Sequence, residues 1–277
     1  MISFNFDYYK PYSIKEAVEV YMELDSLGKQ PLYYSGGTEI ITMARRNTIF
    51  TGAVIDIKGI PECSEFKLTS RSLIIGGAIT LTRVSEENPF PLLSRAASGV
   101  ADHTSRSKIT VGGNICSRII YREAVLPFLL CDSQVIIAGI NGIRRENIND
   151  VFNKTLQLKR GEFLVQLVTD RNYLNLPFAA FKRTRQGRVG YPLINAEAVK
   201  KDSKIRAAFS GVCGFPFRSF KLEEALNMEN MDVNSRISYA IRSLPCSIKD
   251  NIHGSAEYRE FVLREMLLDI LSILEGA

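Results

Sequence analysis

The chain has 277 residues, 45% of them hydrophobic and 23% charged, which is ordinary for a soluble globular protein of one or two domains. Its formal net charge of +5 is mild, and its basic residues are spread out apart from the short run Lys182–Arg188, which argues against a nucleic-acid partner. No stretch reaches the roughly 20 apolar residues of a membrane helix, and Met1–Phe6 does not resemble a signal peptide, so we expect a cytoplasmic protein without membrane contact.

The first part of the chain predicts a small α/β lobe. The segment Ser13–Glu16 is a capping box that opens a helix, and Gly28 is typical of the residue that ends one. A short buried strand is expected at Leu32–Tyr34, one or two helical turns at Glu39–Arg46, and a second strand at Ala53–Ile57.

The next hundred residues mix short strands and helices. Asn141-Gly142 lies between two strand-like segments and predicts a hairpin with a type I′ turn. The strands we expect are Phe66–Leu68, Ser72–Ile75, Gln134–Ile140, Ile143–Asn147 and Phe163–Thr169, and the helices are Thr80–Glu87, Pro91–Val100 and Glu123–Leu130.

The last third predicts strands followed by helices, the order of an α+β module. The polar connection Asp170–Leu176 marks its start. The three strands, expected to form one antiparallel sheet, are Phe178–Arg183, Leu193–Lys200 and Ile205–Val212, and the helices are Phe220–Asn227, Val233–Ser243 and Ala256–Leu274.

Two glycine pairs are the most informative motifs. They occur in Ser35–Thr38 and in Thr110–Asn114, each after a short apolar run. Glycine lets a backbone approach a ligand closely, and consecutive N–H groups can converge on an anion. Two such loops suggest a pyrophosphate held from both sides, with side-chain hydrogen bonds from Thr38 and Asn114. Neither loop matches the Rossmann or P-loop pattern, and the alternative is a pair of ordinary turns, the first of them a helix start capped by Thr38.

The cysteines and histidines argue against metal and nucleophilic chemistry on this chain. The five cysteines are odd in number and form no C-x-x-C pair, and the only histidines are His103 and His253. We therefore expect reduced cysteines and no metal or iron–sulfur site held by this chain alone. Cys116 follows the second glycine pair without a neighbouring base, so we expect no catalytic nucleophile.

These motifs resemble a known family. Tyr34–Ile40 resembles the A-G-G-T-D-L loop of the FAD-binding subunits of molybdenum hydroxylases, and Thr110–Cys116 resembles their T-I-G-G-N-I loop. Gly211–Arg218 is similar to their C-terminal G-V-x-x-x-P-x-R element. The family includes xanthine dehydrogenase, carbon monoxide dehydrogenase and nicotine dehydrogenase.

The resemblance implies an α+β architecture. Residues 1–170 would form a two-lobed, PCMH-type FAD-binding α/β domain, with lobes of about 1–57 and 58–170. Residues 171–277 would form a C-terminal domain, an antiparallel three-stranded sheet with a helical bundle.

The resemblance also implies a role in electron transfer. This chain would bind FAD, while a molybdenum-cofactor large subunit and a [2Fe–2S] small subunit carry the other cofactors. Electrons would pass from the [2Fe–2S] subunit through FAD to NAD or another acceptor, and xanthine or another purine is the favoured substrate of the complex. No catalytic residue and no metal ligand is expected on this chain.

The family's cofactor contacts map onto four parts of this sequence. The residues implied are Tyr33, Tyr34, Ser35, Gly36, Gly37, Thr38, Glu39, Ile40, Thr110, Val111, Gly112, Gly113, Asn114, Glu123, Leu164, Lys182 and Tyr191.

The last four of these have distinct roles in the resemblance. Glu123 would accept a hydrogen bond from the flavin or its ribityl chain, with a helix first-turn charge as the alternative. Lys182 would place a positive charge near reduced flavin, with a solvated strand lysine as the alternative. Leu164 would be an apolar contact, a core residue, or both. Tyr191 would pack near the isoalloxazine ring, although Gly190 stands where the family often has Asp.

Two other interpretations stay open. One is a stand-alone flavin reductase of related fold, of the enolpyruvyl-sugar reductase type, which would need its own proton donor. The other is a non-enzymatic assembly module that has lost flavin, suggested by departures from the family pattern at Ile120, Arg122 and Gly190.

Overall fold

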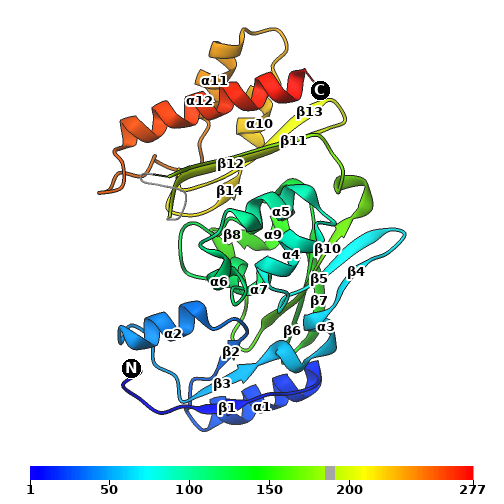
Figure 1. Cartoon of the computed structure of the whole chain (residues 1–277), viewed down its shortest axis with the longest axis vertical. Coiled ribbons are helices and arrows are strands. Elements are labelled where there is room, and N and C mark those ends of the chain that lie inside the picture. The colour runs from blue at the N-terminus through cyan, green and yellow to red at the C-terminus, as the bar shows by residue number, and fades with distance from the viewer. Residues whose placement is uncertain (185–190, 277) are drawn as a thin grey trace.

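The computed structural model describes residues 1–184 and 191–276. Gly190 and residues 185–188 of the basic run therefore lie outside the described residues. The chain forms three successive parts along its longest axis, with the N-terminal lobe at one end and the C-terminal helices at the other (Figure 1). Each part contains its own sheet, and the parts follow one another in the order of the sequence.

The first lobe contains a three-stranded parallel sheet with the order β1-β3-β2. Its elements are β1 (Asp7–Tyr9), α1 (Ile14–Ser26), β2 (Leu32–Tyr34), α2 (Thr38–Arg45) and β3 (Ala53–Asp56). Half of the predicted capping box forms: the Ser13 hydroxyl accepts from the N–H of Glu16, while the Glu16 carboxylate accepts from the N–H of Tyr12 instead of Ser13. Gly28 takes a φ of 72° directly after the end of α1, as its position predicts.

The second lobe is built on a five-stranded antiparallel sheet with the order β4-β5-β10-β6-β7. Its strands are β4 (Phe66–Leu68), β5 (Ser72–Gly76), β6 (Gln134–Gly139), β7 (Gly142–Asn147) and β10 (Phe163–Asp170). Its main helices are α4 (Leu81–Glu87), α5 (Pro91–Ser98), α7 (Val111–Cys116) and α8 (Val125–Leu130).

Both faces of this five-stranded sheet are covered. Helices of the second lobe cover one face, where Ile75 and Val135 pack in one core with Phe128. The first lobe covers the other face, where Phe163 packs in a second core with Ala17 of α1. The two lobes therefore share a hydrophobic contact, which fixes the loops at their common edge.

Several short elements connect the larger ones and escape prediction because three or four residues carry no periodicity. They are η1 (Ile57–Gly59), α3 (Pro61–Ser64), α6 (His103–Arg106), α9 (Ile148–Val151), β8 (Phe152–Asn153), β9 (Thr155–Leu156) and η2 (Arg171–Tyr173).

The hairpin β6–β7 forms as predicted, but the turn type is wrong. A type I′ turn needs positive φ at both central residues. The register pairs Gly139 with Gly142, which makes Ile140 and Asn141 the central residues, and neither has a positive φ. Gly142 alone takes a positive φ, 93°, and it belongs to β7, so the loop lies one residue earlier than predicted.

The C-terminal part is an antiparallel sheet of order β11-β12-β13-β14 with three helices. The three predicted strands form, and a two-residue fourth strand joins them. The elements are β11 (Phe178–Thr184), β12 (Pro192–Lys201), β13 (Lys204–Ser210), β14 (Phe217–Arg218), α10 (Phe220–Leu226), α11 (Val233–Arg242) and α12 (Ala256–Glu275).

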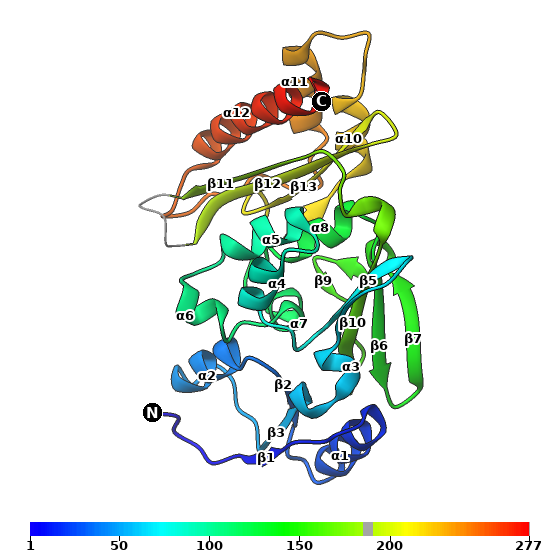
Figure 2. The same cartoon turned by 45° about the vertical axis from the view of Figure 1, so that its right-hand side comes forward.

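The two faces of the C-terminal sheet are buried against different partners. Helices α11 and α12 lie over one face, and α5 and α8 of the second lobe lie under the other (Figure 2). Ala198 and Ala207 pack in the core of the C-terminal helices. Val199 and Ala208, their neighbours in sequence, pack in the core of the second lobe. The interface between the two parts is therefore continuous with the second lobe's own core.

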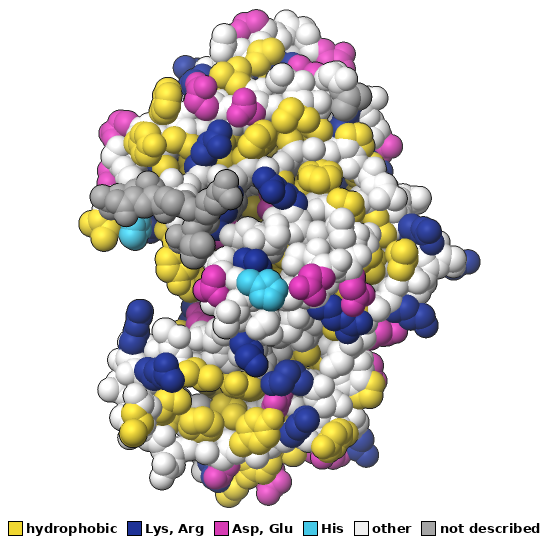
Figure 3. Space-filling model, viewed as in Figure 1, with side chains coloured by type: hydrophobic (Ala, Val, Ile, Leu, Met, Phe, Trp, Pro, Cys, Tyr) yellow, Lys and Arg dark blue, Asp and Glu magenta, His cyan; other side chains and the backbone are white. Residues whose placement is uncertain are grey.

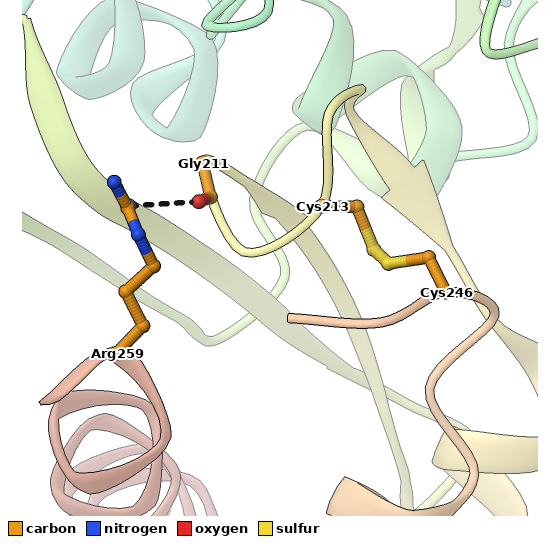
Figure 4. Close-up of a disulfide and its surroundings, with 4 residues drawn as sticks. All are labelled: Gly211, Cys213, Cys246 and Arg259. Carbon is orange, nitrogen blue, oxygen red and sulfur yellow. Dashed lines mark hydrogen bonds between the residues drawn. A yellow bond between two sulfur atoms is a disulfide. The ribbon is translucent and has the colours of Figure 1, made fainter. Parts of the chain in front are cut away.

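The expectation that all cysteines are reduced is wrong for one pair. Cys213 and Cys246 form a disulfide, with their Cα atoms 6.0 Å apart, while Cys63, Cys116 and Cys131 are free (Figure 4). The two cysteines are 33 residues apart in sequence. They meet because the segment after α11 returns across the loop that follows β13, where the Lys249 N–H donates to the Val212 carbonyl at 2.8 Å. Sequence spacing alone does not reveal such a return.

Candidate functional site

The two glycine segments come together at the edge shared by the two lobes. A Cβ placed on Gly36 would lie 1.9 Å from the Lys108 carbonyl oxygen and 3.4 Å from the Cα of Ile109, so only glycine allows this approach. Glu39 strengthens the contact, because its Oε1 accepts a hydrogen bond from the Arg118 N–H at 2.9 Å. The first segment therefore lies against both the entry to the second segment and the exit from it.

The surface is hollowed at this level. Figure 3 shows a recess on the left of the view, between the lobe that carries α2 and the C-terminal part. Lysine and arginine side chains lie along its lower margin (Figure 3). Such a recess with a basic margin suits an anionic ligand.

The first glycine segment ends at the N-terminus of α2. Gly37 is the residue before the helix, with a left-handed φ of 71°, and no side chain caps the helix. The prediction of Thr38 as the cap is therefore wrong, because Thr38 is already the first helical residue. The N–H groups of Thr38, Glu39 and Ile40 have no acceptor within the part of the chain that the structure describes. Free amides at a helix N-terminus favour an anion.

Ser35 adds a further unsatisfied group beside these amides. Its Oγ is buried and finds no hydrogen-bond partner among the described residues. Its carbonyl oxygen accepts from Lys58 Nζ at 2.8 Å, and Lys58 in turn pairs with Asp56 at 2.7 Å. The same ammonium lies 4.8 Å from the centre of the Tyr34 ring. Lys58 therefore holds the backbone of the first segment in place through the Ser35 carbonyl and the Tyr34 ring.

The second glycine segment is built differently and is not an array of free amides. It is the first turn of α7, where Val111 donates to the Ile79 carbonyl at 2.8 Å and Gly112 to the Gly77 carbonyl at 2.9 Å. The Gly113 N–H donates to the Thr110 hydroxyl at 3.0 Å. These N–H groups are used within the protein, so the prediction that they converge on an anion is wrong.

What the second segment offers is an open glycine surface. A Cβ on Gly112 would lie 2.7 Å from the Gly77 carbonyl oxygen, so this glycine serves packing. Gly113 is exposed, and a Cβ there would meet only the Thr110 hydroxyl, at 2.8 Å. Asn114 is buried, and its Oδ1 accepts from the Ala124 N–H at 3.1 Å. Gly113 is therefore the member of this segment that leaves room for a ligand.

Two of the predicted contacts lie in hydrophobic cores instead of at the loops. The ring of Tyr33 packs between Tyr21 and Phe163, at 5.2 and 4.4 Å between ring centres, and burial raises its pKa. Leu164 is 3% exposed and belongs to the core of the second lobe. Leu164 shares that core with Val111 of the second glycine segment, whereas Tyr33 packs in the core of the first lobe.

Glu123 and Lys182 meet at the interface between the second lobe and the C-terminal sheet. Glu123 is 5% exposed and precedes α8, so it is not a first-turn helix charge. The Lys182 ammonium lies 3.9 Å from Glu123 Oε1 and donates to the Gly99 carbonyl at 2.5 Å, so it is not a solvated strand lysine either. The Asn195 side chain, which donates to Ser210 Oγ at 3.1 Å, also acts to lower the pKa of Glu123.

Burial dominates the titration of both partners. It raises the pKa of Glu123 from 4.5 to about 7, against the opposing charge of Lys182. It also lowers the pKa of Lys182 from its ordinary value, while the Glu123 carboxylate acts in the opposite direction. The charge of Glu123 therefore changes with pH close to neutrality.

We expect the raised pKa of Glu123 to appear in the stability of the FAD-free chain. A carboxyl that holds its proton longer when folded stabilises the fold fully below its unfolded pKa of about 4.5 and loses that contribution as pH rises through about 7. Glu123→Gln removes this loss. Urea unfolding at several pH values should show wild-type stability declining relative to the variant between about pH 5 and 8. Parallel pH profiles for the two proteins would contradict the assignment.

Tyr191 lies where a planar ligand could be covered. It is 65% exposed and stacks on Tyr121, with ring centres 5.2 Å apart and planes 24° apart. Arg259 of α12 is fully buried, and its positive charge opposes the rise in the pKa of Tyr121 that burial causes. Arg259 also donates to the carbonyls of Leu193 and Gly211, the latter at 2.9 Å (Figure 4). Arg259 thus joins α12 to the ends of β12 and β13, close to Tyr121.

Sequence reasoning missed Arg259, Lys58 and Glu197, a buried glutamate of β12. Each is a charged residue, and from sequence alone a charged side chain is expected to be exposed to solvent. Among the described residues, no group of three or more His, Cys, Asp or Glu side chains could hold a metal ion. Within the same residues, no helix has the length and apolar character needed to cross a bilayer.

The fold and these segments define a two-lobed protein with two glycine segments and a free helix N-terminus where its lobes meet. Residues 4–168, more than half of the chain, match the family described as the FAD binding domain in molybdopterin dehydrogenase. The chain belongs to this family, and its cofactor is FAD.

Relatives match along nearly the whole chain. The nicotinate dehydrogenase FAD-subunit of Eubacterium barkeri is 22% identical, over 98% of both chains. The carbon monoxide dehydrogenase medium chain of Hydrogenophaga pseudoflava is 24% identical, over 96% of both.

Solved structures show the same fold. The carbon monoxide dehydrogenase structure from Hydrogenophaga pseudoflava covers 100% of this chain and 99% of its own, with a TM-score of 0.88 and 22% identity. The quinoline 2-oxidoreductase of Pseudomonas putida 86 gives a TM-score of 0.84 at 20% identity, over 98% of both chains.

Proposed function

We propose that this chain is the FAD-binding electron-transfer subunit of a molybdenum hydroxylase complex. A molybdenum-cofactor large subunit would carry out the substrate reaction, and a [2Fe–2S] small subunit would pass electrons to FAD on this chain. The observation that carries the proposal is the free N-terminus of α2, which the contacts of Gly36 with Lys108 and of Glu39 with Arg118 hold against the segment that contains the exposed Gly113. These groups could hold the diphosphate of a dinucleotide from two sides. When bound, FAD supplies two-electron redox chemistry, while the chain supplies binding and electrostatics.

Each site residue has a role in this proposal. The amides of residues 38–40 and the Ser35 hydroxyl would donate to the diphosphate. Gly113 would allow close backbone contact. Glu123 would accept a hydrogen bond from the flavin or its ribityl chain, and Lys182 would place a positive charge near the reduced flavin. Tyr191 would pack near the isoalloxazine ring. Residues 1–170, with lobes of about 1–57 and 58–170, would be the FAD-binding domain, and 171–277 would hold the flavin end and a partner subunit.

The substrate and the acceptor are proposed as xanthine or another purine, and NAD. Support comes from the xanthine dehydrogenase FAD-binding subunit of Escherichia coli O157:H7, which is 30% identical over 120 residues, 42% of this chain. Relatives that match over the whole chain are named for nicotinate and carbon monoxide. The substrate would bind on another subunit, in the cytoplasm, so residues of this chain would not select it.

The experiment is purification of the tagged chain from its native host. We expect a yellow complex that contains FAD, molybdenum and iron, and that reduces NAD when xanthine is added. A yellow chain without partners that oxidises NADH would instead support a stand-alone flavin reductase. A colourless chain that fails to take up added FAD would overturn the proposed function. Activity with nicotinate or another substrate would overturn only the purine assignment.

A further inference from the structure

One face of strand β12 carries polar side chains into the interface with the second lobe. The register pairs Asn195 with Lys182 of β11 and with Ser210 of β13, and it pairs Glu197 with Ala208. Ala208 lies on the face that packs in the core of the second lobe. Because side chains alternate along a strand, Asn195 and Glu197 point the same way, toward Glu123.

Glu197 is buried without a full set of partners. It is 3% exposed, and its Oε2 has no hydrogen-bond partner within the described chain. Burial raises the pKa of Glu197 well above its ordinary value, and the negative charge of Glu123 acts in the same direction. A buried carboxylate without a partner is strongly disfavoured, and two neighbouring carboxyls resist double ionisation. We therefore expect one of the two carboxyls, Glu123 or Glu197, to stay protonated.

The other charges in this interface do not supply the missing compensation. Lys182, with Arg106 of α6 beyond it, faces Glu123 at one end of the sheet. At the other end, Arg206 and Arg218 are balanced by Asp132 and by Glu223 of α10. Lys182 can therefore neutralise one of the two carboxylates, and the second carboxyl needs a proton.

We propose that Glu123 and Glu197 form a proton-holding pair that keeps one proton when the flavin is oxidised and takes up a second when the flavin is reduced. The inference rests on the proposed function. Two electrons from the [2Fe–2S] subunit reduce the flavin, which takes one proton from solvent. Reduction adds one negative charge near Lys182. Lys182 then stabilises the Glu123 carboxylate less, so the pair binds a second proton from solvent. Glu197 is a positioning residue that tunes the potential.

The test is the pH dependence of the flavin's reduction potential in the FAD-loaded chain. For a two-electron couple each proton contributes about 30 mV per pH unit. Between about pH 7.5 and 9, we expect a slope of about 60 mV per pH unit in the wild type and about 30 mV in Glu197→Gln. The exposed Glu260→Gln is the matched control and should keep the wild-type slope.

The outcomes distinguish a failure of the proton-holding pair from a failure of the proposed function. If the wild type binds FAD and both proteins share one slope, the proton-holding pair is wrong while the proposed function stands. If the wild type does not bind FAD, the proposed function fails and the inference with it. Should Glu197→Gln not fold, proton uptake by the wild type during electrochemical reduction at about pH 8, where the electrode supplies electrons without protons, decides instead. Two protons for two electrons support the pair, and one proton overturns it.

Discussion

A Gly113→Val chain is expected to fold like the wild type and to bind FAD about 100-fold more weakly. Gly113 is exposed, and a Cβ there meets only the rotatable hydroxyl of Thr110, at 2.8 Å. This hydroxyl caps α7, so moving it costs the fold about 1 kcal/mol, which lowers stability slightly without unfolding the chain. The two methyl groups of valine fill the space that a ligand backbone contact requires. A 100-fold loss corresponds to about 2.7 kcal/mol of binding free energy.

The measurement pairs FAD titration with a thermal melt. Gly276→Val adds the same bulk at an exposed glycine near the C-terminus, far from the loops, and should change neither quantity. Unchanged FAD affinity in Gly113→Val would remove the second glycine segment from the cofactor site. A large drop in melting temperature would instead mean that this glycine serves the fold.

Gly36→Ala should give the opposite profile, although the two glycines belong to similar motifs. Its Cβ would lie 1.9 Å from the backbone carbonyl of Lys108, which cannot move without separating the two lobes. We expect the free energy of unfolding to fall by about 2 kcal/mol together with FAD affinity. The pair of variants thus separates a glycine kept for packing from a glycine kept for ligand approach.

This contrast marks how far the sequence could predict the site. The glycine pairs and their relation to a cofactor were recognisable as motifs, and so were the strands that deliver them. Their different uses depend on Lys108 and Gly77, which approach Gly36 and Gly112 only in the folded chain. No local sequence pattern predicts which backbone N–H groups will donate to acceptors elsewhere in the folded chain. The free helix N-terminus at α2 and the satisfied one at α7 therefore had to come from the structure.

The buried charges were hidden for a related reason. In β12, Asn195 and Glu197 alternate with Ile194, Ala196 and Ala198, a pattern typical of a strand with one solvated face. The second lobe covers that face, so the polar residues end up inside an interface. Period-two alternation predicts correctly which side chains share a face. It does not tell whether water or another part of the chain lies beyond that face.

The second large effect is expected at Asp132, which joins the second lobe to the C-terminal sheet. Its carboxylate accepts from Arg206 at 2.5 Å, from Arg218 at 2.7 Å, and from Tyr173 and Asn149 at 3.0 Å each. Arg218 is almost fully buried, with 4% of its side chain exposed. Removing the carboxylate would leave two guanidinium groups at the interface without this counter-charge.

We expect Asp132→Asn to lower the free energy of unfolding by about 3 kcal/mol at neutral pH, the range found when one partner of a buried ion pair is removed. Asparagine tolerates the positive φ of 47° at this position, so the change tests charge without backbone strain. Urea unfolding gives the difference. Asp202→Asn is the matched control, because Asp202 has a φ of 49° and its side chain, which pairs with Lys201, is 80% exposed. A change within about 0.5 kcal/mol is expected there.

The effect should also depend on pH in a defined direction. Partial burial opposes the charged form of Asp132, but the hydrogen bond from Arg206 and the charge of Arg218 outweigh it and hold its pKa below the ordinary value. A depressed pKa stabilises the fold above the unfolded value of about 3.8, and this contribution is lost as pH falls through the folded value. The difference between wild type and Asp132→Asn should therefore shrink in acid. A difference that stays constant to low pH would show that packing, and not the carboxylate, joins the two parts.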